Sequence, residues 1–169
     1  VLAYVLEEVL QNQPEPVRQF LLRTAILQRF NASLCDELLA AADDDDLPAS
    51  STMTDEASPS ARAILNYLER NGLFVIALDD EQGWYRYYHL VAQALHDELD
   101  RTAPTLHTEL HRRAARWYGA HGFMAEAIEH ALLAQDYAHA ADLLAEAARA
   151  DRVLDAERQR RNSHAVAAE

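Results

Sequence analysis

Hydrophobic and polar positions change their spacing near the middle of the chain. Leu73–Leu78 is a short apolar run, residues 79–83 are polar, and Trp84–Tyr88 is an aromatic run. Two runs rich in β-branched and aromatic residues on either side of a polar turn predict a two-stranded β-ribbon. From His89 onward the apolar residues recur every fourth position, which predicts a helix.

An amphipathic helix is also predicted directly before the ribbon, from Ala61 to Asn71. The Asn71-Gly72 pair at its end is a typical C-terminal stop signal. A helix, a hairpin with an acidic tip and a second helix together form the skeleton of a winged helix. The sequence therefore predicts a mainly α fold that contains a winged helix with a small two-stranded β-ribbon.

Three more helices are predicted upstream of this block. Their ranges are Leu2–Gln13, Glu15–Gln28 and Leu34–Ala42. Pro14 separates the first two, because proline is tolerated at the start of a helix but not in its interior. Asn31 or Ser33 is suited to cap the third helix. Residues 43–58 have almost no apolar content, so a mobile loop is predicted there.

The C-terminal part is also predicted to be helical. Residues 101–105, which include Pro104, are expected to break the chain before three further helices. These are Leu106–His121, Phe123–Gln135 and Ala138–Ala150. Short helices of similar length with small residues at their crossings are typical of helical hairpins stacked in a solenoid. The pattern fades after Asp151, where a truncated next helix or a tail is predicted.

Length and composition suggest a cytoplasmic piece of a longer protein. The chain has 169 residues, and no stretch approaches the roughly 18 consecutive apolar residues of a membrane span. The N-terminus lacks the basic region of a signal peptide, and Glu7-Glu8 interrupts it early. The single cysteine, Cys35, excludes an internal disulfide and fits a reducing compartment. Because the chain begins inside an apolar helix, we expect further protein before Val1.

Net charge limits the partners that the winged helix can have. The formal net charge is −13, from 15 basic and 28 acidic residues, and every basic residue is arginine. The helix in the recognition position carries only Arg62 and Arg70, and the hairpin tip, residues 79–81, is acidic. Affinity for DNA follows the number of cations aimed at phosphates. We therefore expect no direct nucleic-acid contact by this segment.

Two groups of residues have side chains that metals use. His107 and His111 are one helical turn apart, a spacing that can hold zinc. The zinc-peptidase motif has glutamate directly after its first histidine, however, where this chain has Thr108. The acidic residues 43–46 lack the alternating ligands and the glycine of a calcium loop. Structural or surface histidines and a solvated acidic loop are favoured, and no metal site is predicted.

The chain also lacks the residue patterns of an enzyme. Cys35 could act as a nucleophile with His89 or His96 as its base. Its helix position beside apolar residues favours a half-buried packing role instead, and Asp36 would raise the pKa of the thiol. The four glycines form no phosphate-binding loop, and there is no Gly-Lys-Ser/Thr sequence. We predict neither catalysis nor nucleotide hydrolysis by this segment.

Trp117 and Tyr118 admit two interpretations. Aromatic side chains on the inner surface of a solenoid can receive a ligand. Trp117, however, shares a helical stripe with Leu106, Leu110 and Ala114. Packing in the core is therefore the favoured interpretation for this pair.

Three groups of motifs carry a family resemblance. The central group comprises residues 73–80 (LFVIALDD) and 84–91 (WYRYYHLV). The upstream group comprises residues 7–10 (EEVL) and 16–24 (PVRQFLLRT), and the downstream group 110–118 (LHRRAARWY) and 126–131 (EAIEHA). In this order the motifs resemble those of the MalT-like regulators. These are large LuxR-type bacterial transcription activators of the STAND class of signal-transduction ATPases.

The resemblance implies two parts. Residues 1–100 would form a winged-helix coupling domain with its preceding helices, and residues 101–169 would begin a tetratricopeptide-like sensor region. The ATPase module would precede Val1, and the LuxR-type DNA-binding helices would follow Glu169. The segment itself would bind no cofactor, and ATP or ADP would be bound elsewhere in the full-length protein.

The role implied is to couple inducer sensing to the ATPase module and so to transcription activation. The partners implied are the protein's own ATPase module, a small-molecule inducer or a regulatory protein, and other copies of the protein. Two other classes stay open on the residues alone. One is a solenoid adaptor that binds a peptide or a partner protein. The other, disfavoured by charge, is a stand-alone winged-helix DNA-binding domain.

The resemblance also indicates candidate nucleotide-sensing residues. In STAND ATPases a histidine at the strand-to-helix junction of the winged helix contacts the β-phosphate of ADP in the closed, inactive state. The family motif has this histidine directly after Arg-Tyr, and that position here is Tyr88. His89 follows one residue later, rotated by about 100° on a helix. Three alternatives follow: the contact is lost, the Tyr88 hydroxyl replaces it, or the register differs and His89 makes it.

Overall fold

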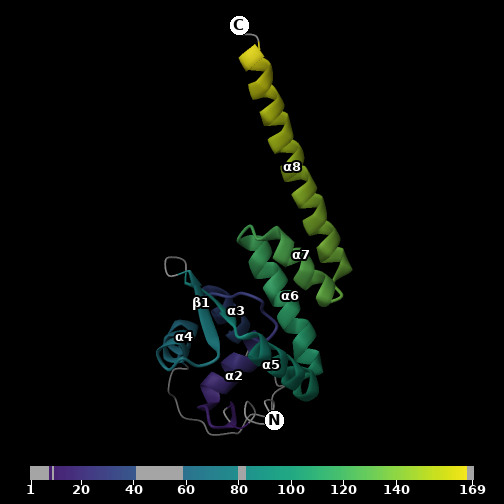
Figure 1. The fold of residues 1–169 in the computed structure, drawn as a ribbon. Helices are drawn as coiled ribbons and strands as arrows, with labels where there is room; N and C mark the ends of the chain where they lie inside the picture. Colours follow the sequence, from purple (N-terminus) through teal and green to yellow (C-terminus); the bar gives the residue numbers. More distant parts are fainter. Residues whose placement is uncertain (1–7, 9, 41–58, 80–82, 167–169) are drawn as a thin grey trace.

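A computed structural model describes residue 8 and residues 10–40, 59–79 and 83–166. Its elements, in chain order, are α2 (Glu15–Thr24), α3 (Ala32–Leu39), α4 (Ala61–Arg70), β1 (Val75–Asp79), β2 (Trp84–Tyr87), α5 (His89–Thr102), α6 (Pro104–Ala120), α7 (Met124–Leu133) and α8 (Tyr137–Val166). Helices α2 to α7 and the hairpin pack together, whereas most of α8 projects away from them (Figure 1). The predicted mainly α fold with a two-stranded ribbon is confirmed.

The winged helix contains, in chain order, α2, the bridge residue Phe30, α3, α4, the β1–β2 hairpin and α5. Strands β1 and β2 pair antiparallel with Val75 opposite Tyr87, and the register shifts between Ala77 and Asp79. Phe30, between α2 and α3, forms an isolated bridge with Tyr85. Its N–H donates to the Tyr85 carbonyl at 2.9 Å, and the Tyr85 N–H donates back at 2.7 Å. Phe30 therefore extends the ribbon from a distant part of the chain.

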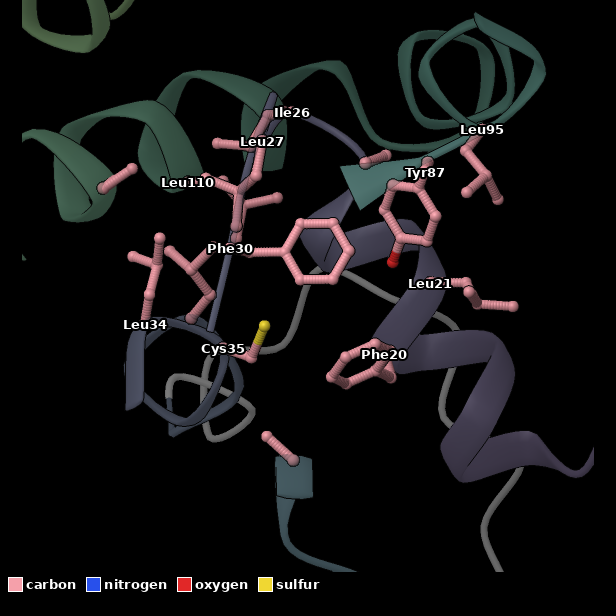
Figure 2. Packing of buried hydrophobic residues seen from close by; sticks show 14 of the residues in the cluster. Phe20, Leu21, Ile26, Leu27, Phe30, Leu34, Cys35, Tyr87, Leu95 and Leu110 are labelled. Carbon is pink, nitrogen blue, oxygen red and sulfur yellow. The ribbon is translucent and has the colours of Figure 1, made fainter. Parts of the chain in front are cut away.

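The core of the winged helix is built around Phe30. Its ring lies 4.7 Å from the Tyr87 ring and points toward it, with Cys35 on α3 close by (Figure 2). The Tyr87 hydroxyl and the Thr24 hydroxyl are 2.5 Å apart, and Thr24 also donates to the Phe20 carbonyl at 2.7 Å. The buried hydroxyls satisfy one another, so the hairpin is joined to α2 without an unpaired polar group at this contact.

Two helix starts follow local capping rules. The Asn31 side chain accepts a hydrogen bond from the Leu34 N–H at 2.9 Å, so Asn31 rather than Ser33 caps α3. The Ser60 hydroxyl accepts from the Ala63 N–H at 3.3 Å and caps α4. Gly72, just after α4, has a φ of +61°, a left-handed conformation that glycine adopts without a steric penalty.

Several predicted boundaries are wrong. The helix predicted over Glu15–Gln28 ends at Thr24, because the chain must leave α2 for Phe30 to reach the ribbon. The third helix is Ala32–Leu39 rather than Leu34–Ala42. The break predicted over residues 101–105 is confined to Ala103, since Pro104 is accommodated in the first turn of α6.

The prediction for the C-terminal residues is also wrong. Helix α8 continues through the expected fading point to Val166. Its second half, residues 152–166, contains four arginines and two alanines, residue types that favour a helix without any apolar face to bury. Three of its large apolar side chains, Leu144, Val153 and Leu154, are exposed.

Some predictions lie outside the described residues. These are most of the helix at Leu2–Gln13, the loop at 43–58 and the hairpin tip at 80–82. Among the helices that the structure describes, none is both long and apolar enough to cross a bilayer.

Candidate functional site

The predicted nucleotide-sensing residues lie where β2 passes into α5. Tyr88 is the N-cap residue of α5, with φ −58° and ψ 140°, and its side chain makes no capping hydrogen bond. Its N–H donates to the Phe74 carbonyl, and its carbonyl accepts from the Ala92 N–H, both at 2.9 Å. Hydrogen bonds to Phe74 and to Ala92 therefore fix the backbone of Tyr88 at this junction.

The side chains at this junction pass from the core to the surface after Tyr87. Tyr87 is buried against α2, whereas Tyr88 is 48% exposed and His89 and Leu90 are exposed as well. The N–H groups of a first helical turn favour anions. The Tyr88 hydroxyl and the His89 imidazole are both available beside such a turn. An ADP-sensing role for either residue stays a prediction.

The second feature is an aromatic contact between the winged helix and the α6–α7 hairpin. Trp84 on β2 packs edge-on against Trp117 of α6 and Phe123, with ring centroids 6.4 and 5.4 Å apart. The Arg29 guanidinium lies 5.0 Å from the Trp84 ring centre and 5.3 Å from that of Phe123. Cation–π contacts of this kind are worth roughly 0.5–2 kcal/mol, depending on solvent access.

Polar bonds surround the aromatic contact. The Tyr118 hydroxyl donates to the Arg29 carbonyl at 2.7 Å, and the Arg29 guanidinium pairs with the Glu126 carboxylate. The Gln28 amide donates to Glu129 at 3.0 Å. A small pocket lies among these groups, lined by Gln28, Arg29, Tyr118, Glu126, Glu129 and His130. We name this set of aromatic and polar contacts the aromatic junction.

The core interpretation of Trp117 is confirmed. Its side chain is only 7% exposed and stacks on the His121 ring at 3.9 Å. Its indole N–H donates to the Ser33 hydroxyl on α3 at 3.4 Å. Trp117 therefore joins α6 to the winged helix rather than facing solvent.

The third feature is a chain of four histidines from three helices. His96 on α5, His107 and His111 on α6, and His130 on α7 form successive ring contacts with centroids 4.7 to 4.9 Å apart. The Nδ1 atoms of His111 and His130 are 2.7 Å apart, and the Nε2 atoms of His107 and His111 are 3.2 Å apart. We name this set the histidine chain.

Burial sets the charge at the inner end of the histidine chain. Burial, together with the smaller effects of the neighbouring His130 and His107, lowers the pKa of His111 to about 3. Burial also lowers the pKa of His130 to about 4, although the Glu126 carboxylate acts in the opposite direction. Both rings are neutral at pH 7, so each has one donor and one acceptor nitrogen.

Sequence reasoning identified only part of the histidine chain. His107 and His111 were recognisable from their spacing, and His111 is the buried structural histidine that was favoured. His96 and Asp100 have the same spacing of four residues on α5 and could have been noticed. No signal in the sequence places His130 beside His111, because that contact depends on how α6 and α7 pack.

Cys35 is a packing residue, as its position beside apolar residues in the sequence predicts. Its side chain is fully buried rather than half-buried. Burial raises the pKa of its thiol, and the Asp36 carboxylate raises it further. A neutral, inaccessible thiol is a small apolar filler rather than a nucleophile.

Comparisons with known proteins agree with the fold and the motifs. Residues 6–107 match the family model of the MalT winged helix domain. The HTH-type transcriptional regulator MalT of Cronobacter sakazakii is 35% identical over 141 residues, which are 83% of this chain and 14% of that protein. MalT of Klebsiella pneumoniae is 31% identical over the same length, again 83% of this chain and 14% of that protein.

A protein kinase is similar to this chain over the same number of residues. The serine/threonine-protein kinase PknK of Mycobacterium tuberculosis is 31% identical over 141 residues, 83% of this chain and 11% of the kinase. The chain thus spans between 11% and 14% of the length of these relatives. The resemblance to MalT-like regulators is confirmed, and the chain belongs to the MalT winged-helix family.

Proposed function

We propose that the chain is the non-catalytic coupling segment of a MalT-like, LuxR-type transcription regulator of the STAND class. In this role it transmits inducer binding in a helical sensor region, which begins at about residue 101, to an ATPase module that precedes the winged helix. The full-length protein binds ATP or ADP in that module and acts in the cytoplasm. Residues 1–100 are the coupling domain.

The aromatic junction is the observation that carries this proposal. Arg29 and Trp84 come from the winged helix, whereas Trp117, Phe123 and Glu126 come from the α6–α7 region. Closely packed side chains transmit a displacement because a well-packed core has little room to absorb it. A movement of α6 and α7 on inducer binding would therefore move β2 and the α2–α3 connection with it.

The relatives support a regulatory rather than a catalytic role. A transcriptional regulator and a protein kinase are both similar to this chain over 141 residues. Because the same segment occurs in proteins with different named activities, we infer that it carries a regulatory task common to both rather than either activity itself. We propose transcription activation as the output here, because the sequence motifs are those of the MalT-like regulators.

The coupling role is tested with Arg29→Gln in the full-length protein. This change removes the guanidinium that contacts Trp84, Phe123 and Glu126. If the aromatic junction carries the signal, reporter activation should fall about five-fold or more while ATP binding is retained. The control is Arg62→Gln, an exposed arginine on α4. Equal activation by both variants would exclude coupling through this contact.

The nucleotide-sensing role is tested with Tyr88→His, also in the full-length protein. A histidine here would add a donor to the β-phosphate of ADP, and such a charge-assisted bond is worth about 1.5–3 kcal/mol. ADP affinity should then rise about ten-fold or more, and basal activation should fall as the closed state gains population. Loss of ADP affinity in His89→Ala alone would assign the contact to His89. No effect of either variant would remove the sensing role.

A solenoid adaptor that binds a partner protein is the second candidate function. Large apolar side chains are exposed on α7 and α8, namely Leu132, Leu133, Tyr137 and Leu144. Apolar surface of this kind favours a protein contact. The complete reading frame discriminates between the candidates. An ATPase motif upstream and a helix-turn-helix downstream would support the regulator. A kinase domain would indicate a regulatory segment with a different output. The absence of all three would favour the adaptor.

A further inference from the structure

Three metal-ligating side chains meet at the corner between α5 and α6. The Asp100 carboxylate lies 3.8 Å from the Nε2 atom of His96 and 3.6 Å from the Nδ1 atom of His107. One ligand atom from each of the three residues lies within 4.8 Å of the others. His96 and Asp100 are one turn apart on α5, and His107 is brought to them by the sharp change of direction at Ala103.

The hydrophobic core does not require these side chains. The buried face of α5 is formed by Val91, Leu95 and Leu99. The His96, Asp100 and His107 side chains keep 42%, 51% and 23% of their surface exposed. They can therefore be reached from solvent and can adjust their rotamers without disturbing the core.

We propose that His96, Asp100 and His107 form a binding site for Zn²⁺. Imidazole nitrogen and carboxylate oxygen are established zinc ligands, and three protein ligands leave a fourth position for water. Ligand atoms at about 2.0–2.1 Å from a tetrahedral zinc lie about 3.3–3.4 Å apart. The observed separations of 3.6 and 3.8 Å exceed this by a few tenths of an ångström, although they involve different oxygens of the Asp100 carboxylate. The three ligand atoms together lie within 4.8 Å of one another. A zinc ion would draw the ligand atoms closer through rotations of the three side chains, all of which are at least partly exposed to solvent.

The rest of the histidine chain supplies the outer shell of this site. Zinc on Nδ1 of His107 leaves the proton of that ring on Nε2, which lies 3.2 Å from Nε2 of His111. His111 accepts this proton's hydrogen bond and donates from Nδ1 to His130 at 2.7 Å. Buried partners that orient a ligating imidazole strengthen metal binding. The direction of every hydrogen bond in the histidine chain is thus compatible with zinc at its outer end.

Because the site lies between α5 and α6, a bound metal would affect how these two helices are arranged. Helix α5 belongs to the segment that matches the winged-helix family model, which ends at residue 107, whereas α6 leads into α7 and α8. A zinc ion held by both helices would fix the angle of the α5–α6 corner. This inference does not depend on the coupling role or on nucleotide binding.

The site is tested by titrating ZnCl₂ into the metal-free 169-residue chain and measuring heat. We expect one equivalent to bind, and His96→Gln and Asp100→Asn each to weaken the affinity about ten-fold or more. At zinc concentrations about 100 times Kd, the Tm of the unsubstituted chain should rise by about 5–10 °C. His89→Gln removes an exposed histidine at the other end of α5 and should bind zinc as the unsubstituted chain does.

Two spectroscopic measurements locate the ion. Co²⁺ in place of zinc should give the intense visible absorption of a tetrahedral site, and Asp100→Asn should reduce it. Long-range ¹H–¹⁵N spectra should find the His107 proton on Nε2 only when zinc is bound. Unchanged zinc affinity in both His96→Gln and Asp100→Asn would overturn the proposal, and so would a loss of affinity in His89→Gln of the same size.

Discussion

The two ends of helix α6 contact the rest of the molecule through different chemistry. Its C-terminal half contributes Trp117 and Tyr118 to the aromatic junction. Its N-terminal half contributes His107 and His111 to the histidine chain. Both ends join α6 to α7 and to the winged helix. The contacts at the C-terminal end are mainly apolar, whereas those at the N-terminal end are hydrogen bonds and ring contacts between imidazoles.

The two contacts should respond differently to solution conditions. Burial of aromatic surface at Trp117 depends little on protons, salt or metal ions. Each bond in the histidine chain instead depends on which nitrogen carries the proton, because a neutral ring donates from one nitrogen and accepts at the other. We infer that the aromatic end provides most of the stability, whereas the histidine end is adjustable. The predictions that follow separate these contributions.

The largest effect is expected for Trp117→Ala. The side chain is buried between α3, β2 and Phe123, and its loss leaves a cavity at the aromatic junction. Replacing a buried tryptophan by alanine costs about 3–5 kcal/mol in the free energy of unfolding. Urea denaturation of the 169-residue chain measures this cost.

A matched aromatic residue provides the control for Trp117. Tyr137 begins α8 and is 66% exposed, so Tyr137→Ala should change the free energy of unfolding by no more than about 0.5 kcal/mol. A cost below about 1 kcal/mol for Trp117→Ala would contradict the assignment of most of the stability to the aromatic end.

The sequence predicted the elements whose signals are local. The start of α5 at His89 and the hairpin before it follow from turn chemistry and a change of apolar spacing. The end of α2 was mispredicted because the Phe30 bridge to Tyr85 involves residues 55 positions apart, which no local pattern reports. The length of α8 was underestimated because apolar spacing indicates burial, and an exposed helix can form without it.

The candidate sites also differ in whether local sequence signals predict them. Trp117 could be assigned to the core because its apolar stripe lies on one helix. The site of Tyr88 and His89 at a strand-to-helix junction could be predicted, whereas their chemical role depends on a nucleotide bound by another part of the protein. The histidine chain could not be predicted as a whole, because its members come from α5, α6 and α7 and meet only through packing.

A pH-dependent loss of stability is expected at the histidine end. Burial lowers the pKa of folded His130 to about 4, whereas an unfolded histidine has a pKa of about 6.5. The unfolded state therefore binds more protons below pH 6.5, and stability falls as the pH decreases toward 4. Between pH 7.5 and pH 5, His130 should account for a loss of about 2 kcal/mol.

The contribution of His130 is isolated by a substitution. The groups that face its ring are His111 and Tyr118 on α6, with Glu126 one turn earlier on α7. His130→Gln keeps a polar side chain but cannot titrate, so its stability should depend less on pH than that of the unsubstituted chain. Urea denaturation at both pH values, with a chelator present, measures the difference. Identical pH dependence in the two proteins would show that His130 does not make the histidine end adjustable.

The smallest effect concerns the polar part of the aromatic junction, where Arg29 pairs with Glu126. Their side chains are 41% and 28% exposed, and water weakens ion pairs of that kind. A double-mutant cycle with Arg29→Gln and Glu126→Gln should therefore give a coupling energy of only about 0.5–1 kcal/mol. This coupling energy should decrease in about 1 M NaCl, where the Debye length is only about 3 Å. The cost of Trp117→Ala should persist in the same salt, since it comes from apolar packing. A coupling energy that exceeds about 2 kcal/mol would assign a major share of the stability at this end to charge, and the comparison between the two ends of α6 would then no longer hold.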